Sequence, residues 1–134
     1  MEQYMARSNK FGGETLRRYI QLKISSIEPK LERRMSPYGK QLLANYMSDR
    51  VMIDVPAYMR TRERFRSDET KRMIFETVNR TLSKFMEGNL SVMEQSRYTV
   101  VNGKTYLWKV TIVVEDGCAR EWGNEMMLVP EGHA

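Results

Sequence analysis

The dipeptide Asn102-Gly103 constrains the fold of this chain more than any other feature, because apolar residues alternate on both sides of it. Asn-Gly readily adopts the two positive φ angles that a two-residue hairpin turn requires. Apolar side chains recur at every second position in residues 98–101 and 106–114, as they do in the strands of a hairpin. The sequence therefore predicts an antiparallel hairpin over residues 96–115.

The second strand of this hairpin carries an apolar face, made of the alternating residues Tyr106, Trp108, Val110, Ile112 and Val114. Such a face is normally covered, so we expect helices or another subunit to lie on it. We therefore place the rings of Tyr106 and Trp108 in the core. The two-residue turn sets Arg97 opposite Trp108, where the guanidinium could stack on the indole ring.

The residues that follow the hairpin contain a second turn and a candidate strand. Asp116-Gly117 is typical turn chemistry and ends the second strand. Residues 126–129 are apolar and are a candidate third strand. The C-terminal third of the chain therefore predicts a small antiparallel hairpin or meander.

The first helical segment is indicated by apolar residues at spacings of three and four. These are Leu16, Ile20, Ile24, Ile27 and Leu31. Proline removes a backbone donor and clashes with the preceding turn, so Pro29 predicts a break within residues 25–28. We expect a short second piece to begin at this proline.

Two further helices have clear start signals. Ser36-Pro37 combines an N-cap serine with proline at the first helical position, and it predicts a helix over about residues 37–51. Ser67, followed by two acidic residues, begins a third helix that ends at Gly88-Asn89. Residues 52–66 lack a helical stripe, and we interpret them as an edge strand or an extended connector.

The predicted fold class is α+β, with about three N-terminal helices packed on the C-terminal sheet. A length of 134 residues with 41% hydrophobic content is typical of one domain with one core. Residues 1–13 are polar, end in two glycines and show no periodicity. We therefore expect a flexible arm over residues 1–13 and a single α+β domain over residues 14–134.

Four arginines at two-residue spacing form the main candidate binding site. They are Arg60, Arg62, Arg64 and Arg66. In an extended chain they would share one face and form a ladder of guanidinium groups suited to phosphates. In a helix the same residues would scatter around the axis. The alternative interpretation is a solvated basic face that pairs with the nearby Asp and Glu residues.

Other candidate ligand-binding residues are basic or aromatic. Neighbouring helices would add Arg33, Arg34, Lys71 and Arg72, and the first strand would add Arg97 and Tyr98. The net charge of +5 is uneven, positive over the first 85 residues and negative over residues 86–134. One end of the chain could therefore attract the other end of a second copy, which makes a homo-oligomer an alternative.

Catalysis and metal binding have little support in the sequence. The single histidine, His133, is the penultimate residue, and the lone Cys118 has no visible partner. We predict no catalytic residues, no metal ligands and no cofactor, with a phosphate-directed hydrolase as a minor alternative. No apolar run suits a signal peptide or a membrane span, so we expect a cytoplasmic protein without a membrane partner.

The function that we predict is that of a non-enzymatic binding module, which engages a polyanion, preferably nucleic acid, through the arginine ladder. The alternative is a small protein-interaction factor, such as an inhibitor, an adaptor, an assembly subunit or a viral accessory protein. It would use the same arginines on an acidic protein surface or a nucleotide-sized anion. The eleven methionines favour adaptable protein surfaces and keep this alternative open.

Overall fold

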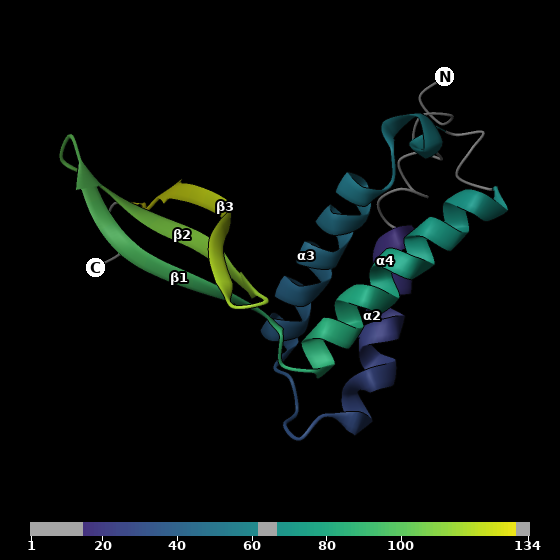
Figure 1. Ribbon diagram of the computed structural model, residues 1–134. Coiled ribbons are helices and arrows are strands. Elements are labelled where there is room, and N and C mark those ends of the chain that lie inside the picture. Colours follow the sequence, from purple (N-terminus) through teal and green to yellow (C-terminus); the bar gives the residue numbers. More distant parts are fainter. Residues whose placement is uncertain (1–14, 62–66, 131–134) are drawn as a thin grey trace.

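The computed structural model describes residues 15–61 and 67–130 of the chain. Its helices are α2 (Leu16–Ile27), α3 (Pro37–Asp54) and α4 (Asp68–Met86), with the short 3-10 helices η2 (Glu28–Lys30) and η3 (Ala57–Arg60) between them. The strands β1 (Leu90–Val101), β2 (Lys104–Glu115) and β3 (Cys118–Leu128) form an antiparallel meander in the order β1-β2-β3. The predicted α+β class is confirmed (Figure 1). The predicted arm, residues 1–13, lies outside the described residues.

The helices begin and end where their caps require. The side chain of Ser36 accepts a hydrogen bond of 2.9 Å from Gly39 N, and that of Ser67 accepts one of 3.2 Å from Thr70 N. The predicted break at Pro29 is confirmed, because α2 stops at Ile27 and η2 contains the proline. α4 closes at Gly88, which has a φ of +81° that suits glycine.

The prediction of an edge strand or extended connector is wrong for residues 52–60. α3 runs on to Asp54, and η3 follows after Pro56. Val55 is extended because the following proline disfavours the helical conformation. The weak apolar stripe of this segment hid the last helical turn, since Met52 and Ile53 are exposed.

The sheet has the predicted hairpin and a longer third strand than predicted. Asn102 and Gly103 have φ angles of 51° and 75°, as the two-residue turn requires. Arg97 pairs with Trp108, which confirms the predicted register. The turn at Asp116-Gly117 is equally tight, so β3 begins at Cys118 rather than near residue 126. Its irregular apolar pattern results from a shift of register beside Trp122.

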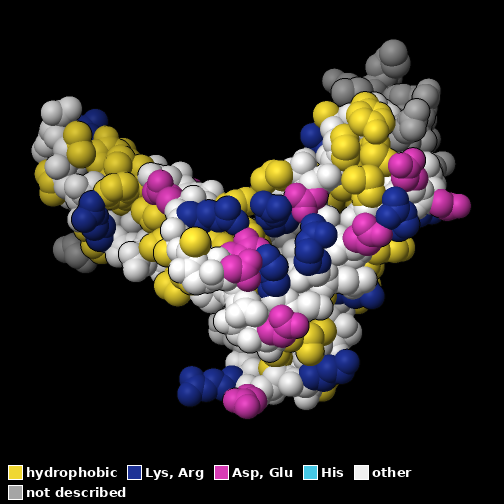
Figure 2. All heavy atoms as spheres, viewed as in Figure 1, with side chains coloured by type: hydrophobic (Ala, Val, Ile, Leu, Met, Phe, Trp, Pro, Cys, Tyr) yellow, Lys and Arg dark blue, Asp and Glu magenta, His cyan; other side chains and the backbone are white. Residues whose placement is uncertain are grey.

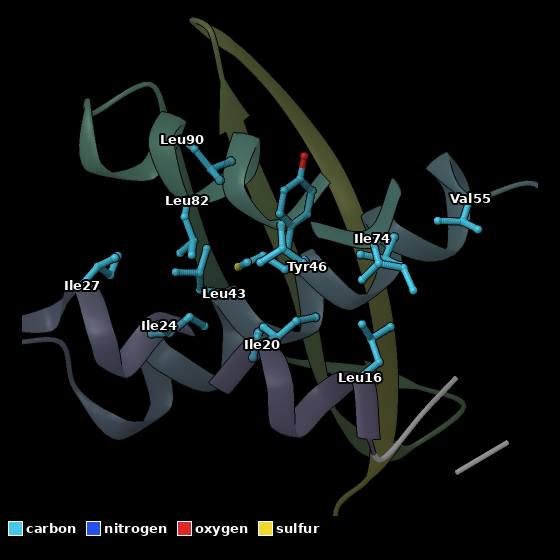
Figure 3. Packing of buried hydrophobic residues seen from close by; sticks show 14 of the residues in the cluster. Leu16, Ile20, Ile24, Ile27, Leu43, Tyr46, Val55, Ile74, Leu82 and Leu90 are labelled. Carbon is cyan, nitrogen blue, oxygen red and sulfur yellow. The ribbon is translucent and has the colours of Figure 1, made fainter. Parts of the chain in front are cut away.

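The core lies between the helices and the base of the sheet (Figure 3). Side chains from α2, α3 and α4 supply most of it, and the sheet contributes Leu90 and Val113. The rest of the sheet projects away from the helices, with the Asn102-Gly103 turn at its far end (Figure 1).

The helices pack on the opposite face of β2 from the one that the sequence predicted to be covered. Val113 is fully buried, and Val92, its partner on β1, packs against the core. Tyr106 and Trp108 are half-buried and belong to neither group, so their placement in the core is wrong. Alternation shows that a strand has two faces, but the packing of the base on α3 and α4 decides which face is buried. We call the face that carries Val92 and Val113 the inner face, and the opposite face the outer face.

Candidate binding surfaces

The arginine ladder lies largely outside the described residues. This applies to Arg62, Arg64 and Arg66, whereas Arg60 is the last residue of η3. The Nε atom of Arg60 donates a hydrogen bond of 3.1 Å to the carbonyl oxygen of Val55. At this position the backbone is helical rather than extended, and one donor of the guanidinium group is already used.

The predicted basic residues are not gathered at one place. Arg33 and Arg34 precede α3, whereas Arg60 follows it. At 1.5 Å per residue, the 18 residues of α3 separate the two ends by about 27 Å. Arg33 and Arg34 are exposed, and neither has an ion pair with any described residue.

Lys71 and Arg72 lie near the start of α4 and differ in their surroundings. The guanidinium of Arg72 forms an ion pair of 2.6 Å with Glu76, one turn further along the helix. Lys71 borders a pocket of about 200 Å³, whose remaining lining is Thr15, Leu16, Tyr19, Ile74 and Phe75. The charge of Arg72 is therefore neutralised locally, whereas Lys71 lies beside an apolar hollow between α2 and α4.

Arg97 and Tyr98 are neighbours on β1 and point to opposite faces of the sheet. The guanidinium of Arg97 lies 4.5 Å from the centre of the Trp108 ring, so the predicted stacking is confirmed. Tyr98 is on the inner face, beyond the helices, and is 70% exposed. The two residues therefore cannot contact the same ligand group from one face.

The outer face of the sheet is an apolar strip that the helices leave open. Cross-strand partners share a face, so the pairs Arg97–Trp108 and Trp108–Met126 place these three side chains in one row. Its apolar and aromatic members are Met93, Val101, Tyr106, Trp108, Val110, Ile112, Val114, Ala119, Met126 and Leu128. None of them belongs to the core or packs against it. Figure 2 shows apolar side chains gathered over the projecting sheet.

The charges of the strands are divided between the two faces. The carboxylates of Glu94, Glu115 and Glu125 lie on the inner face. The outer face has Arg97 and Lys104 and a single carboxylate, Glu121. A shallow pocket of about 280 Å³ lies beside the stacked pair and is lined by Gln95, Ser96, Arg97, Trp108 and Val110. The centre of the outer face thus combines apolar surface with a guanidinium that has no ion pair with any described residue.

A network of polar side chains holds the base of the sheet to the helices. Glu115, the last residue of β2, accepts hydrogen bonds from Tyr46 at 2.7 Å, Arg120 at 2.7 Å and Lys84 at 3.0 Å. Burial alone would raise the pKa of Glu115, but the bonds from Tyr46 and Lys84 and the positive charges of Lys84 and Arg120 hold that pKa below its ordinary value. Sequence reasoning missed this network, because its members are far apart in the chain.

Trp122 completes the contact between the sheet and α3. Its ring packs edge-on against Tyr46 with 4.8 Å between centres, and its Nε1 atom donates a hydrogen bond of 2.8 Å to Asp49. Burial, followed by the hydrogen bond with Glu115, raises the pKa of the Tyr46 hydroxyl. The extra residue at the irregularity of β3 turns the indole toward the helices.

The described residues contain no group of three or more His, Cys, Asp or Glu side chains that could hold a metal ion. Cys118 is exposed at the start of β3, and His133 lies outside the described residues. Within the described ranges, no helix combines the length and apolar character needed to cross a membrane.

No family model matches this chain, and no curated protein or solved structure resembles it to a significant degree.

Proposed function

We propose that this protein is a non-enzymatic interaction protein that binds a partner protein on the outer face of its sheet. The observation that carries the proposal is the open apolar strip on a sheet that projects from the helices. Met93, Met126 and Leu128 on this strip are 42%, 50% and 54% exposed. Contiguous exposed apolar surface on a folded domain is typical of a protein interaction site.

The composition of the outer face supports a protein partner. Interface centres are enriched in tyrosine, tryptophan, methionine and arginine and depleted in carboxylates. Tyr106, Trp108, Met126 and Arg97 supply these residue types on neighbouring strands. Trp108 is half-buried beneath the guanidinium of Arg97 and its Nε1 donates to Asn124, so the ring is held in place before any partner arrives.

The charge of the outer face indicates the chemistry of the partner. Arg97 stacks on Trp108 but has no ion pair with a described residue, so its remaining donors can bind a carboxylate. Lys104 adds a second cation at the hairpin end. The partner that fits is a protein surface with an apolar patch bordered by Asp or Glu, which agrees with an adaptor, an inhibitor or an assembly subunit.

A photo-crosslinking pair tests this proposal. Benzoylphenylalanine replaces Gln95 on the outer face in the full chain, and replaces the exposed Gln21 on α2 as the matched control. After irradiation in cells that naturally make the protein, we expect the crosslinker at position 95 to form adducts with a partner protein. The crosslinker at position 21 should form none of these adducts. The additional change Trp108→Ala should reduce the adducts at least tenfold. Equal adduct patterns at both positions contradict the proposal.

Polyanion binding is the second candidate function. It is favoured by the exposed Arg33 and Arg34, which lack ion pairs with the described residues, and by the arginine-rich segment 60–66. Fluorescence anisotropy with labelled single- and double-stranded RNA and DNA tests it across a salt series. Nucleic-acid binding should weaken steeply with salt, and Arg62→Glu with Arg64→Glu should abolish it without loss of the fold. Absence of binding at low salt excludes this candidate.

A further inference from the structure

The end of β3 lies at the edge of the sheet, where some of its peptide groups have no backbone partner among the residues that the structure describes. The N–H of Val129 donates a hydrogen bond of 2.9 Å to the carbonyl oxygen of Thr105, so the odd-numbered residues here point their peptide groups toward β2. By alternation, the peptide groups of Asn124, Met126 and Leu128 point away from the sheet. None of the three has a backbone partner among the described residues.

This edge lacks the features that usually prevent strands from pairing with one another. Natural edges are protected by proline, by charged side chains, by bulges or by short strands. After the irregularity beside Trp122, residues 124–129 contain no proline, and their one charged residue is Glu125. Met126 and Leu128, whose peptide groups face outward, are about half exposed. The edge therefore offers backbone donors and acceptors for a further strand, and its exposed side chains are mostly apolar.

We infer that β3 pairs antiparallel with β3 of a second copy of this chain, which joins the two sheets into one. Antiparallel pairing of a strand with its own copy has two-fold symmetry, so the assembly closes as a dimer. Pairing of β3 with β1 of another copy would instead leave one free β3 edge and one free β1 edge on every oligomer, and these two edges could pair again, so the assembly would grow without limit. β1 is also less accessible at its start, where Leu90 is buried and Val92 packs on the core.

Charge selects the register of the pair. With Met126 on the two-fold axis, Asn124 lies opposite Leu128 and Glu125 opposite Met127 of the second copy, so no like charges face each other. Moving the axis to Glu125 sets two glutamates directly opposite one another, which is destabilising. Moving it to Met127 sets Asn124 against Pro130, which has no N–H to donate. The residues at the end of β3 therefore favour the register in which the two-fold axis passes through Met126.

The expected interface is small. About six main-chain hydrogen bonds would form, because each outward-facing residue exchanges two bonds with its opposite residue. Opposite residues share a face, so the two outer faces would become one continuous surface. We expect on the order of 1,000 Å² of buried area in total and a dissociation constant in the micromolar range. The inference rests on the edge alone and does not depend on the proposed function.

Disulfide trapping of the full chain tests the register. In a Cys118→Ser background, Met126→Cys places two thiols opposite each other with Cα atoms about 5.5 Å apart, which a disulfide can bridge. Glu125→Cys is the matched control, because its two Cα atoms would be about 8 Å apart, too far for a disulfide. Mild oxidation at about 50 μM should convert Met126→Cys to a covalent dimer at least tenfold faster than Glu125→Cys. Equal rates contradict the inference.

Sedimentation velocity of the unmodified chain gives an independent readout. We expect a monomer–dimer equilibrium at micromolar concentration, and Met126→Pro should abolish it, because the missing N–H points outward and the pairing with β2 is kept. Circular dichroism checks that this variant folds, and Leu128→Lys, which adds an edge charge, serves in its place if it does not. A chain that stays monomeric up to about 200 μM overturns the inference but leaves the Gln95 adducts unaffected. Loss of those adducts from a dimeric chain overturns only the proposed function.

Discussion

The hydroxyl of Tyr46 donates a hydrogen bond of 2.7 Å to Oε1 of Glu115, and this bond joins the middle of α3 to the last residue of β2. Tyr46 is 1% exposed, so its ring belongs to the helical core while its hydroxyl reaches the sheet. Lys84 from α4 and Arg120 from β3 bind the same carboxylate. Four elements therefore meet at one side chain.

This junction explains how a three-stranded sheet can project from the helices. The base of the sheet is held by buried Val113, by the Glu115 network and by Trp122, whereas none of the described helices covers the distal part. Figure 2 shows Lys, Arg, Asp and Glu side chains side by side over this region. The contacts at the base thus fix the position of the sheet relative to the helices, and the distal part of the sheet stays accessible.

Tyr46→Phe tests the contribution of the hydroxyl at this junction. The change keeps the ring in the core and removes one donor to a charged acceptor, so we expect a loss of about 1–2 kcal/mol in the free energy of unfolding. Urea denaturation measures it. Tyr106→Phe is the control, because Tyr106 is half-buried on the outer face and should change stability by less than about 0.5 kcal/mol. Equal effects of the two changes would show that the hydroxyl bond adds nothing.

The lowered pKa of Glu115 predicts a particular pH dependence. A carboxylate with a folded-state pKa below its unfolded value of about 4.3 stabilises the fold above that value, and the stabilisation is lost as the pH falls through the folded-state pKa. Wild type should therefore exceed Glu115→Gln in stability above about pH 5, and this difference in stability should shrink progressively as the pH falls below about 4. Urea titrations of both proteins from pH 3 to pH 7 measure it. A gap that stays constant over this range contradicts the prediction.

Valine truncation on the two faces of β2 tests which face packs on the helices. Val113→Ala removes buried methyl groups and should reduce stability by about 2 kcal/mol. Val110→Ala makes the same chemical change on the half-buried outer face, and we expect less than half that loss. Thermal and urea unfolding report both values. The reverse order would mean that the helices cover the outer face.

Glycine replacement tests the hairpin turn. Gly103 has a φ of +75°, so Gly103→Ala should be strained and lose about 1 kcal/mol. Gly123 has no positive φ, and an added Cβ would meet Thr111 at an ordinary 3.7 Å, so Gly123→Ala should be nearly neutral. Urea midpoints for the two variants compare them directly. A larger loss from Gly123→Ala would contradict this assignment of strain.

Local signals in the sequence predicted the elements well where their chemistry is self-contained. Asn102-Gly103 specifies the turn and with it the register that sets Arg97 over Trp108. Ser36 and Ser67 specify helix starts through their own side chains. The prediction for residues 52–60 was wrong because Met52 and Ile53 are exposed apolar residues, and an apolar stripe cannot be recognised when its members face water.

The candidate site was harder to predict, because a binding surface joins residues that are distant in the chain. The sequence placed Arg33, Arg34 and Arg60 in one site, but α3 separates them, and Arg97 and Tyr98 point to opposite faces. The outer face was recognised as apolar but was expected to be covered. Tyr46, Glu115 and Trp122 carried no signal, since each is ordinary in its local context.

By itself, the sequence determined the α+β class, the helix starts, the two positive-φ positions of the hairpin turn and the pairing of β1 with β2, because each depends on backbone preferences within a few residues. Only the tertiary structure decided which face of the sheet is buried. Both faces of β2 carry apolar side chains, and the choice depends on how the base of the sheet docks on α3 and α4 through Val113 and Glu115. Docking of this kind sums contacts between distant residues, which no local pattern records.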